Sequence, residues 1–244
     1  MQTLALAGEV EELHNERNCV LRVGRVGFSN NTIAIDTSGR GNDGTCTGNC
    51  VWNNSANAYY VIAATGGPGE GGTLTIADDS SISPGAGDFS VSVWFKTSRD
   101  YSTLFTSIIC NYGADVKSMY RIDIVSADNK LGFYYRDENG NQLSSTGQGA
   151  VINDNKWHHT VSVRKGTVLH TYLDGVEIGS NTNVSIVSIN TMGGGLLYIG
   201  SYASTPSSLS YFYDGYAANI LFYSRALSAA EIHKLYLKGK DKHK

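Results

Sequence analysis

Three of the six histidines, His158, His159 and His170, lie close together in the segment NKWHHTVSVRKGTVLHTYLDGVEIG. Imidazole nitrogens are frequent metal ligands and general bases, so the segment raises the question of a metal or catalytic site. Its alternation of apolar and polar residues predicts two β-strands. Because successive side chains of a strand point to opposite faces, His158 and His159 are expected to point apart.

A two-residue turn at Lys165-Gly166 would join these strands into a hairpin. In that register Arg164 pairs with Thr167, and Val161 pairs with His170. The register assigns each residue of the hairpin to one face of the sheet.

His159 and His170 then share a face as diagonal neighbours, with Cα atoms about 7 Å apart. With no carboxylate expected on that face, two imidazoles are too few ligands for a metal ion. We therefore expect these histidines to lie in the core or at its edge and to form hydrogen bonds with the backbone.

Four cysteines, Cys19, Cys46, Cys50 and Cys110, allow three disulfide pairings, and the sequence does not choose among them. The stretch CTGNC either closes a small disulfide loop or holds two thiols. A zinc site would need a second close pair of Cys or His ligands, which the sequence lacks.

The composition favours one all-β domain with no nucleic-acid partner. Of the 244 residues, 41% are hydrophobic and 17% are charged, and the 28 Gly and 3 Pro suit short strands joined by turns. A net charge of -3 gives no electrostatic case for binding nucleic acid. Nothing approaches an apolar run of about 18 residues, so no membrane span is expected. No export signal is visible, and secretion after removal of a signal stays open.

Period-two alternation predicts a meander of antiparallel strands, and one helix closes the domain. Ser228 and Glu231 form a predicted capping box at the start of this helix. The stretch 10–18 could be a helical turn, and residues 203–215, rich in Ser and Tyr, read as a long loop suited to binding. Strands are expected within residues 19–28, 88–98, 103–110, 119–126, 130–137, 141–145, 196–202 and 215–227.

Four segments together resemble the concanavalin A-like, laminin G-like domain. They are residues 36–49 (DTSGRGNDGTCTGN), 81–98, 155–179 and 198–236. The resemblance follows the family's order over about residues 20 to 237. It implies a two-sheet antiparallel jelly-roll sandwich with one short C-terminal helix, in which the Trp-His-His strand is framework. We divide the chain into an N-terminal arm (1–18), the domain (19–237) and a basic C-terminal tail (238–244), expected to be solvated or to contact an acidic partner.

Many members of this family bind calcium through acidic residues in rim loops, and this chain departs from the usual positions. It has Thr65 where members often carry the aspartate of Phe-Asp-Gly, and Ala218 where they often carry that of Ile-Asp-Glu. The usual calcium site is therefore in doubt, although Asp78, Asp79 or Asp214 could build another.

The resemblance favours a non-enzymatic recognition or adhesion module that binds carbohydrate on a particle or cell surface. Aromatic faces would stack on pyranose rings, and amide or carboxylate groups would bind sugar hydroxyls. The candidate ligand-binding residues lie in two loops. They are Tyr202, Tyr211, Tyr213 and Tyr216 in one, and Asn111, Tyr112 and Asp115 in the other.

The alternative is a structural assembly protein, such as a virion decoration or fibre component, in which both terminal segments contact other subunits. Both readings place the chain on an extracellular surface or a virion. An enzyme is disfavoured because the Glu-x-Asp-x-x-Glu motif of the related hydrolases is absent. The tight acidic pairs Asp78-Asp79 and Asp137-Glu138 sit in predicted turns, where adjacent side chains diverge.

Overall fold

The structure is a computed structural model of the chain. It describes residues 18–26, 32–61, 71–77, 79–103, 105–112, 118–125, 128–183, 185–186, 188–189, 195–205 and 208–243. The expected helical turn at 10–18 and the predicted N-terminal arm therefore lie outside the described residues, apart from residue 18.

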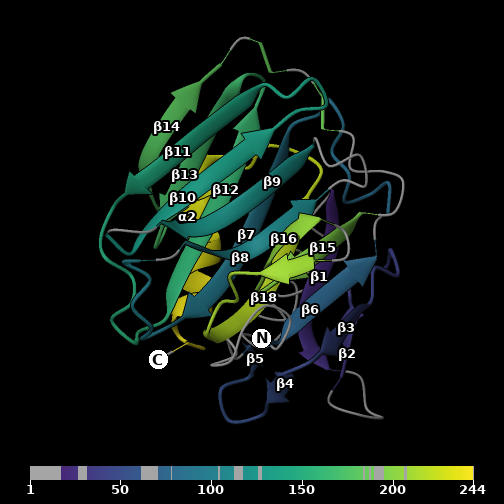
Figure 1. Ribbon diagram of the computed structural model, residues 1–244, viewed down its shortest axis with the longest axis vertical. Coiled ribbons are helices and arrows are strands. Elements are labelled where there is room, and N and C mark those ends of the chain that lie inside the picture. The colour runs from purple at the N-terminus through teal and green to yellow at the C-terminus, as the bar shows by residue number, and fades with distance from the viewer. Residues whose placement is uncertain are drawn as a thin grey trace, which may run out of the picture.

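Short strands dominate the described chain, and one helix follows them (Figure 1). The elements are β1 (Cys19–Val26), β2 (Ile33–Asp36), β3 (Gly44–Thr47), β4 (Cys50–Asn53), β5 (Ala58–Val61), β6 (Thr73–Ala77), β7 (Phe89–Lys96), β8 (Thr106–Tyr112), β9 (Met119–Val125), β10 (Lys130–Arg136), β11 (Gln142–Gln148), β12 (His158–Lys165), β13 (Val168–Leu173), β14 (Val176–Thr182), β15 (Leu196–Ile199), β16 (Tyr202–Thr205), β17 (Ser208–Ser210), β18 (Gly215–Tyr223) and α2 (Ala229–Lys240).

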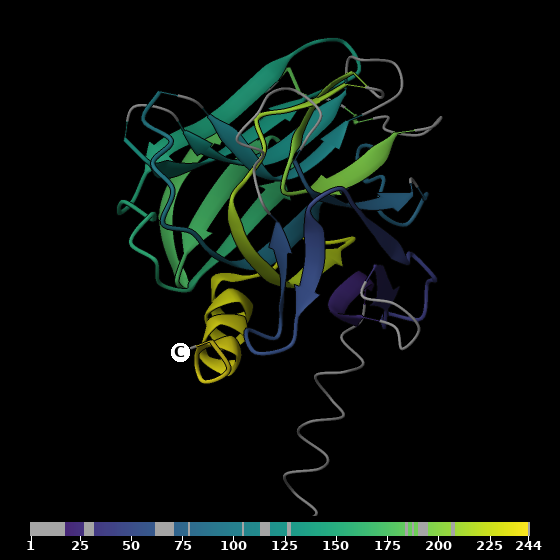
Figure 2. The same cartoon turned by 60° about the horizontal axis from the view of Figure 1, so that its bottom comes forward.

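Hydrogen bonds join the strands into one antiparallel sheet in the order β11-β10-β9-β8-β15-β6-β3-β2-β1-β18-β7-β12-β13-β14. β5 pairs with both β4 and β18, and β16 with β17 forms a separate hairpin. The sheet doubles back, so that β11 at one end lies beside β14 at the other and two layers face each other (Figures 1 and 2). The expected jelly-roll sandwich is confirmed.

The core lies between the two layers and is built from alternate residues of facing strands. On β7, Phe89, Val91, Val93 and Phe95 point inward. Phe89 stacks on Phe222 of β18 with the ring centroids 5.6 Å apart. Because these positions are fully or almost fully buried, the period-two pattern of the sequence corresponds to the real inner face.

Two asparagines close the seam between the end strands of the sheet. The side-chain amide of Asn181 donates to the carbonyl of Ser144 at 2.8 Å, and that of Asn183 donates to Gln142 at 3.0 Å. These bonds satisfy backbone acceptors that an edge strand would otherwise present to solvent.

The hairpin of β12 and β13 forms two residues out of the predicted register. Lys165 pairs with Val168 and Val163 with His170, so the turn lies at Gly166-Thr167. Gly166 takes a φ of 58°, the left-handed value that the first position of such a turn needs. A shift of two residues keeps every side chain on its predicted face.

Helix α2 covers the outer face of the layer that contains β18, β7 and β12 (Figure 2). The predicted capping box is confirmed: Ser228 accepts from the Glu231 N–H, and the Glu231 carboxylate accepts from the Ser228 N–H at 2.8 Å. The helix continues to Lys240, so part of the predicted basic tail is helical, and His243 beyond it is buried. No helix in the described part of the chain is long and apolar enough to cross a membrane.

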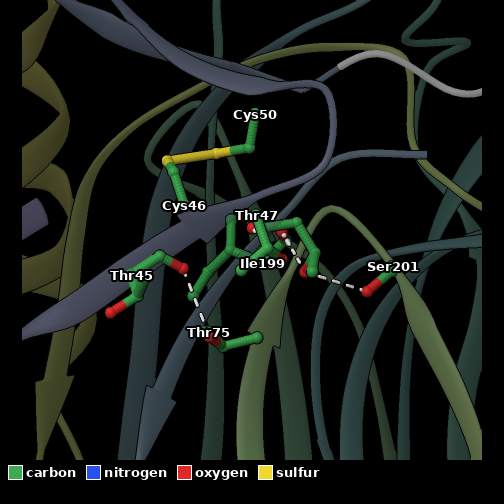
Figure 3. Close-up of a disulfide and its surroundings, with 8 residues drawn as sticks. Thr45, Cys46, Thr47, Cys50, Thr75, Ile199 and Ser201 are labelled. Carbon is green, nitrogen blue, oxygen red and sulfur yellow. Dashed lines mark hydrogen bonds between the residues drawn. A yellow bond between two sulfur atoms is a disulfide. The ribbon is translucent and has the colours of Figure 1, made fainter. Parts of the chain in front are cut away.

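A disulfide joins Cys46 at β3 to Cys50 at the start of β4, a pairing that the sequence left open (Figure 3). Cys19 and Cys110 carry thiols. Beside the disulfide, the Thr73 hydroxyl donates to the Ile199 carbonyl at 3.1 Å. This bond ties β6 to the end of β15 next to the small loop.

The predicted strands within residues 19–28, 88–98, 103–110, 119–126, 130–137, 141–145, 196–202 and 215–227 are all present. The predicted loop at 203–215 is partly wrong, because most of β16 and all of β17 lie within it. The antiparallel pairing of Tyr202 with Ser210 gives this stretch a hairpin that its Ser and Tyr content did not indicate.

We predict that Gly239→Ala destabilises the protein. A Cβ at residue 239 would overlap the indole of Trp94, so the helix would have to lift from the sheet. Overpacking of this kind costs about 1 to 3 kcal/mol. Urea unfolding followed by tryptophan fluorescence measures the change. Lys234→Ala, on the exposed side of the same helix, is the control and should change the stability by less than about 0.5 kcal/mol.

Candidate functional site

The strand register places three side chains of a candidate site in a row across the outer face of the sheet. Tyr216 of β18 pairs with Tyr60 of β5 on one side and with Lys96 of β7 on the other. Directly paired residues share a face, so these three side chains lie next to one another. The next row contains Ala218 and Trp94, which are buried. The row of Tyr60, Tyr216 and Lys96 is only half-buried and remains accessible.

Aromatic rings form one wall of this site. Tyr60 and Tyr216 stack with their centroids 4.6 Å apart and their planes 25° apart. Trp157 lies 6.0 Å from Tyr216, and His243 lies 4.5 Å from Trp157 between ring centroids. Ring–ring contacts thus connect the accessible tyrosines to the buried end of the chain.

Polar side chains form the rest of a pocket of about 680 Å³. Arg99 approaches Asp214 at 3.8 Å, with about a third of each side chain exposed. A pocket with an aromatic wall and a few convergent polar groups is the usual form of a small-ligand site. Its lining residues are Tyr60, Lys96, Thr97, Ser98, Arg99, Asn155, Asp214, Gly215 and Tyr216.

Hydrogen bonds from the core fix the backbone beneath the pocket. The Tyr213 hydroxyl donates to the Lys96 carbonyl at 2.8 Å. The Asp214 N–H donates to the Tyr101 hydroxyl at 2.8 Å, and the Thr97 hydroxyl donates to the Asp214 carbonyl at 2.7 Å. The backbone that carries Asp214 is therefore positioned by buried partners.

Gly215 is needed for this close approach of two segments. A Cβ at residue 215 would overlap the Lys96 carbonyl oxygen and the Tyr213 hydroxyl. Any larger residue would push β18 away from β7 at the base of the pocket.

Burial and neighbouring charges set the protonation states in the pocket. Burial raises the pKa of the Asp214 carboxyl, and the Arg99 guanidinium opposes this shift. Burial, followed by the Asp214 charge and by Tyr216, raises the pKa of Tyr60. At neutral pH Tyr60 therefore keeps its hydroxyl proton and can donate it to a ligand oxygen.

His158 holds the loop that carries Asn155. Its ring nitrogens bond Asp174 at 2.9 Å and Asp154 at 3.1 Å, and the Asn155 N–H donates to the Thr97 carbonyl at 3.0 Å. Burial opposes the charged imidazole, but the two carboxylates outweigh it and raise the pKa of His158. The expected role in the framework therefore holds, although the bonding partners are carboxylates and not backbone groups.

His159 and His243 both stack on the Trp94 indole, at 5.0 and 4.8 Å between centroids. His159 also bonds the Ser92 hydroxyl at 2.8 Å, and His243 bonds the Asn219 amide at 3.0 Å. Burial lowers the pKa of His159 to about 3, while burial and then the Lys242 charge lower the pKa of His243 to about 4. Both imidazoles are neutral at physiological pH.

His170 departs from the expectation that no carboxylate shares its face. Its Nδ1 lies 2.9 Å from Glu177, which also accepts from the Tyr172 hydroxyl at 3.2 Å. A register shift between β13 and β14 places Glu177 opposite Tyr172, which the sequence did not indicate. The described residues still hold no group of three or more His, Cys, Asp or Glu side chains suited to a metal ion.

The structure separates the predicted ligand-binding tyrosines. Tyr216 lines the pocket, whereas Tyr202 and Tyr211 belong to a second cluster around Phe105. Tyr211 is 42% exposed and stacks on Phe105 at 4.6 Å. The Arg121 guanidinium lies over the Phe105 ring at 5.3 Å. This second cluster is aromatic and partly exposed.

Three other predicted site residues are buried, so the structure does not expose their side chains to a ligand. Tyr213 and Asn111 are fully buried, and Tyr112 is 5% exposed. Tyr213 uses its hydroxyl to bond the backbone beneath the pocket, while Tyr112 packs in an apolar cluster on β8. Asp115 lies outside the described residues.

The residues at the family's calcium positions do not supply ligands where they are described. Ala218 is buried against Trp94 and Ala58 and has no side-chain oxygen. Thr65 and Asp78 lie outside the described residues. Of the other acids considered, Asp79 accepts from the Ser81 N–H at 2.8 Å and Asp214 pairs with Arg99. The described residues bring together no group of three or more carboxylates that could hold calcium.

Sequence reasoning missed most of the pocket. Tyr60, Lys96, Arg99 and Asn155 are separated in the chain and meet only through the pairing of β5, β18 and β7. The sequence offered one signal: Lys96 is a charged residue at the end of the predicted strand, on the face opposite its apolar inner face.

Comparison with known proteins agrees with this architecture. A model of the concanavalin A-like lectin/glucanases superfamily, of laminin G type, matches residues 68–233. The chain therefore belongs to this family. No curated protein matches the sequence.

Similar solved structures share the fold at low sequence identity. The binding domain of Paraclostridial Mosquitocidal Protein 1 superposes with a TM-score of 0.66 at 16% identity, covering 90% of this chain and 52% of that one. A botulinum neurotoxin type C structure, from work on its interaction with two ganglioside molecules, has a TM-score of 0.70 at 15% identity and covers 94% and 52%. The binding domain of botulinum neurotoxin DC in complex with SialylT has a TM-score of 0.69 at 15% identity and covers 93% and 52%. The chain spans about half the length of these structures.

We predict that the stability falls on acidification below pH 6.5 because of the neutral histidines on Trp94. The folded-state pKa of His243, about 4, lies below the ordinary value of 6.5, so the unfolded chain takes up a proton first. The resulting stability is complete above pH 6.5 and is lost as the pH falls towards 4.

The variant His243→Phe keeps a planar ring against Trp94 and removes this titration. Its stability difference from the wild type should change on the order of 1 kcal/mol per pH unit between pH 6.5 and 4, in the direction of a relatively more stable variant at acid pH. Chemical unfolding at several pH values measures it. Parallel pH profiles of the two proteins would contradict the assignment of a neutral buried imidazole.

Proposed function

We propose that the chain is a non-enzymatic recognition module that binds a glycan in the pocket of Tyr60 and Tyr216. The observation that supports this most is the combination of a stacked tyrosine pair with polar groups in one accessible pocket. An aromatic face binds the C–H face of a pyranose, and carboxylate, amide and basic groups bind its hydroxyls. Asp214, Asn155 and the Tyr60 hydroxyl would take the second role.

The family and the fold support the same proposal. The chain belongs to a superfamily of lectins and glucanases, and structures of the same fold include a neurotoxin that interacts with two ganglioside molecules and a neurotoxin binding domain in complex with SialylT. At 15% identity these likenesses concern the fold, so the glycan site of this chain rests on its own pocket.

The pocket favours binding over hydrolysis. Glycoside hydrolysis generally uses two carboxylates that flank the bond to be cleaved. Asp214 is the only carboxylate among the described residues that line the pocket, and it is paired with Arg99. Recognition without catalysis is the chemistry that this set supports.

We further propose that the module acts on an extracellular cell or particle surface. The Cys46–Cys50 disulfide supports this, since such bonds persist mainly in oxidising surroundings. The assembly role stays a prediction. Within one of its two predicted docking segments, the tail 238–244, Gly239 and His243 pack on the domain of the same chain.

A glycan array, followed by calorimetry with the best ligand, tests the site. We expect Tyr216→Ala to weaken binding by at least about tenfold because it removes a ring that stacks on the sugar. Tyr211→Ala, which changes the second aromatic cluster, is the matched control and should bind as the wild type does. If Tyr211→Ala loses binding and Tyr216→Ala retains it, the glycan site lies on the second cluster and the pocket assignment is wrong.

We also predict that glycan binding does not depend on calcium. Because Ala218 supplies no side-chain oxygen and the described residues bring no group of three or more His, Cys, Asp or Glu side chains together, a chelator should change the affinity by less than about twofold. Titrations with added calcium and with EDTA measure the effect. Binding that disappears in EDTA and returns with calcium would refute this prediction and show that other residues hold the ion.

A further inference from the structure

The charges of the pocket indicate which glycans it prefers. Two basic side chains, Lys96 and Arg99, and one acidic side chain, Asp214, line it. The pocket is therefore net positive although the whole chain carries a formal charge of -3. The positive charge of the pocket therefore comes from its own lining residues and not from the net charge of the chain.

Lys96 is the clearest basic group. Within the described part of the chain it forms no ion pair, whereas Lys130 pairs with Asp128 at 3.7 Å and Lys156 with Asp154 at 3.3 Å. Its place opposite Tyr216 in the antiparallel register sets its stem beside the tyrosine ring. A charged group attached to a pyranose that stacks on this ring would lie within reach of the ammonium.

Arg99 offers a second donor group. Its contact with Asp214 spans 3.8 Å, and about a third of each side chain is exposed, so solvent weakens the pair. A guanidinium has five N–H donors, and one loose contact leaves most of them available to a ligand. Arg99 follows β7 by three residues and lines the same pocket as Lys96.

We propose that this pocket selects acidic glycans, in which a carboxylate or sulfate is attached to a pyranose ring. This inference rests on the proposed glycan-binding function. The ring stacks on the Tyr60 and Tyr216 wall, and Lys96 and Arg99 bind the anion. Asp214 and Asn155 bind neighbouring hydroxyls, and the Asp214 carboxylate disfavours a ligand with a second anion at that end of the pocket.

Matched pairs of probes test the preference by titration calorimetry. The pairs are sialyllactose with lactose, oligogalacturonate with its methyl ester, and sulfated with unsulfated N-acetyllactosamine. These arms distinguish a sialic acid, a uronic acid and a sulfate as the source of the charge. We expect the acidic member of at least one pair to bind at least about tenfold more tightly than its neutral partner. The difference should shrink as the salt concentration rises to about 0.5 M.

Lys96→Gln replaces the ammonium with a neutral amide on a shorter side chain and so removes the charge. It should abolish most of the acidic preference, measured as the ratio of the affinities for the acidic and the neutral member of each pair. Lys165→Gln is the matched control, because Lys165 is exposed at the opposite end of β12 from the pocket. Circular dichroism and thermal unfolding confirm that each variant is folded.

The outcomes separate this inference from the proposed function. Equal binding of acidic and neutral partners, or an acidic preference that survives in Lys96→Gln, overturns the selectivity and leaves glycan binding in place. If folded wild-type protein binds no probe of any charge, and the wider array is also silent, both the proposed function and the selectivity fail.

Discussion

The contact between helix α2 and the Trp94 indole is the constraint on which the outer face of the domain depends. Gly239 lies directly against the indole, and His159, His243 and Tyr236 stack around it. Because only a residue without a Cβ fits at position 239, the helix can lie close enough to bury the row of Trp94 and Ala218. An apolar sheet face is thereby removed from water without a third layer of strands.

The pocket is a consequence of where this cover ends. The buried row is followed by the half-buried row of Tyr60, Tyr216 and Lys96, on the same face of the same three strands. The stacking of His243 on Trp157, and of Trp157 near Tyr216, connects the two rows. The tyrosine wall of the pocket therefore lies on paired strands, and hydrogen bonds with the Tyr213 and Tyr101 hydroxyls fix the floor of the pocket from the core side.

The sequence predicted the fold well because its signals are local. Alternating Phe89, Val91, Val93 and Phe95 identifies the inner face of β7, and Ser228 with Glu231 identifies the helix start. The site could not be predicted to the same extent, because Tyr60, Lys96 and Asp214 are brought together by pairing between strands far apart in the chain. Counting tyrosines in one segment could not separate Tyr216 in the pocket from Tyr213 in the core, since one residue more or less along the chain changes the face.

The seam closed by Asn181 and Asn183 has a consequence for crowding. Edge strands with unpaired backbone N–H and C=O groups can pair with strands of neighbouring molecules. At high local concentration this pairing forms sheets shared between molecules. Here the carbonyls of Ser144 and Gln142 on β11 already accept from the amides of Asn181, on β14, and Asn183, which follows it. Sheet formation between neighbouring copies is therefore disfavoured at this seam, because these two backbone acceptors already have partners within the same molecule.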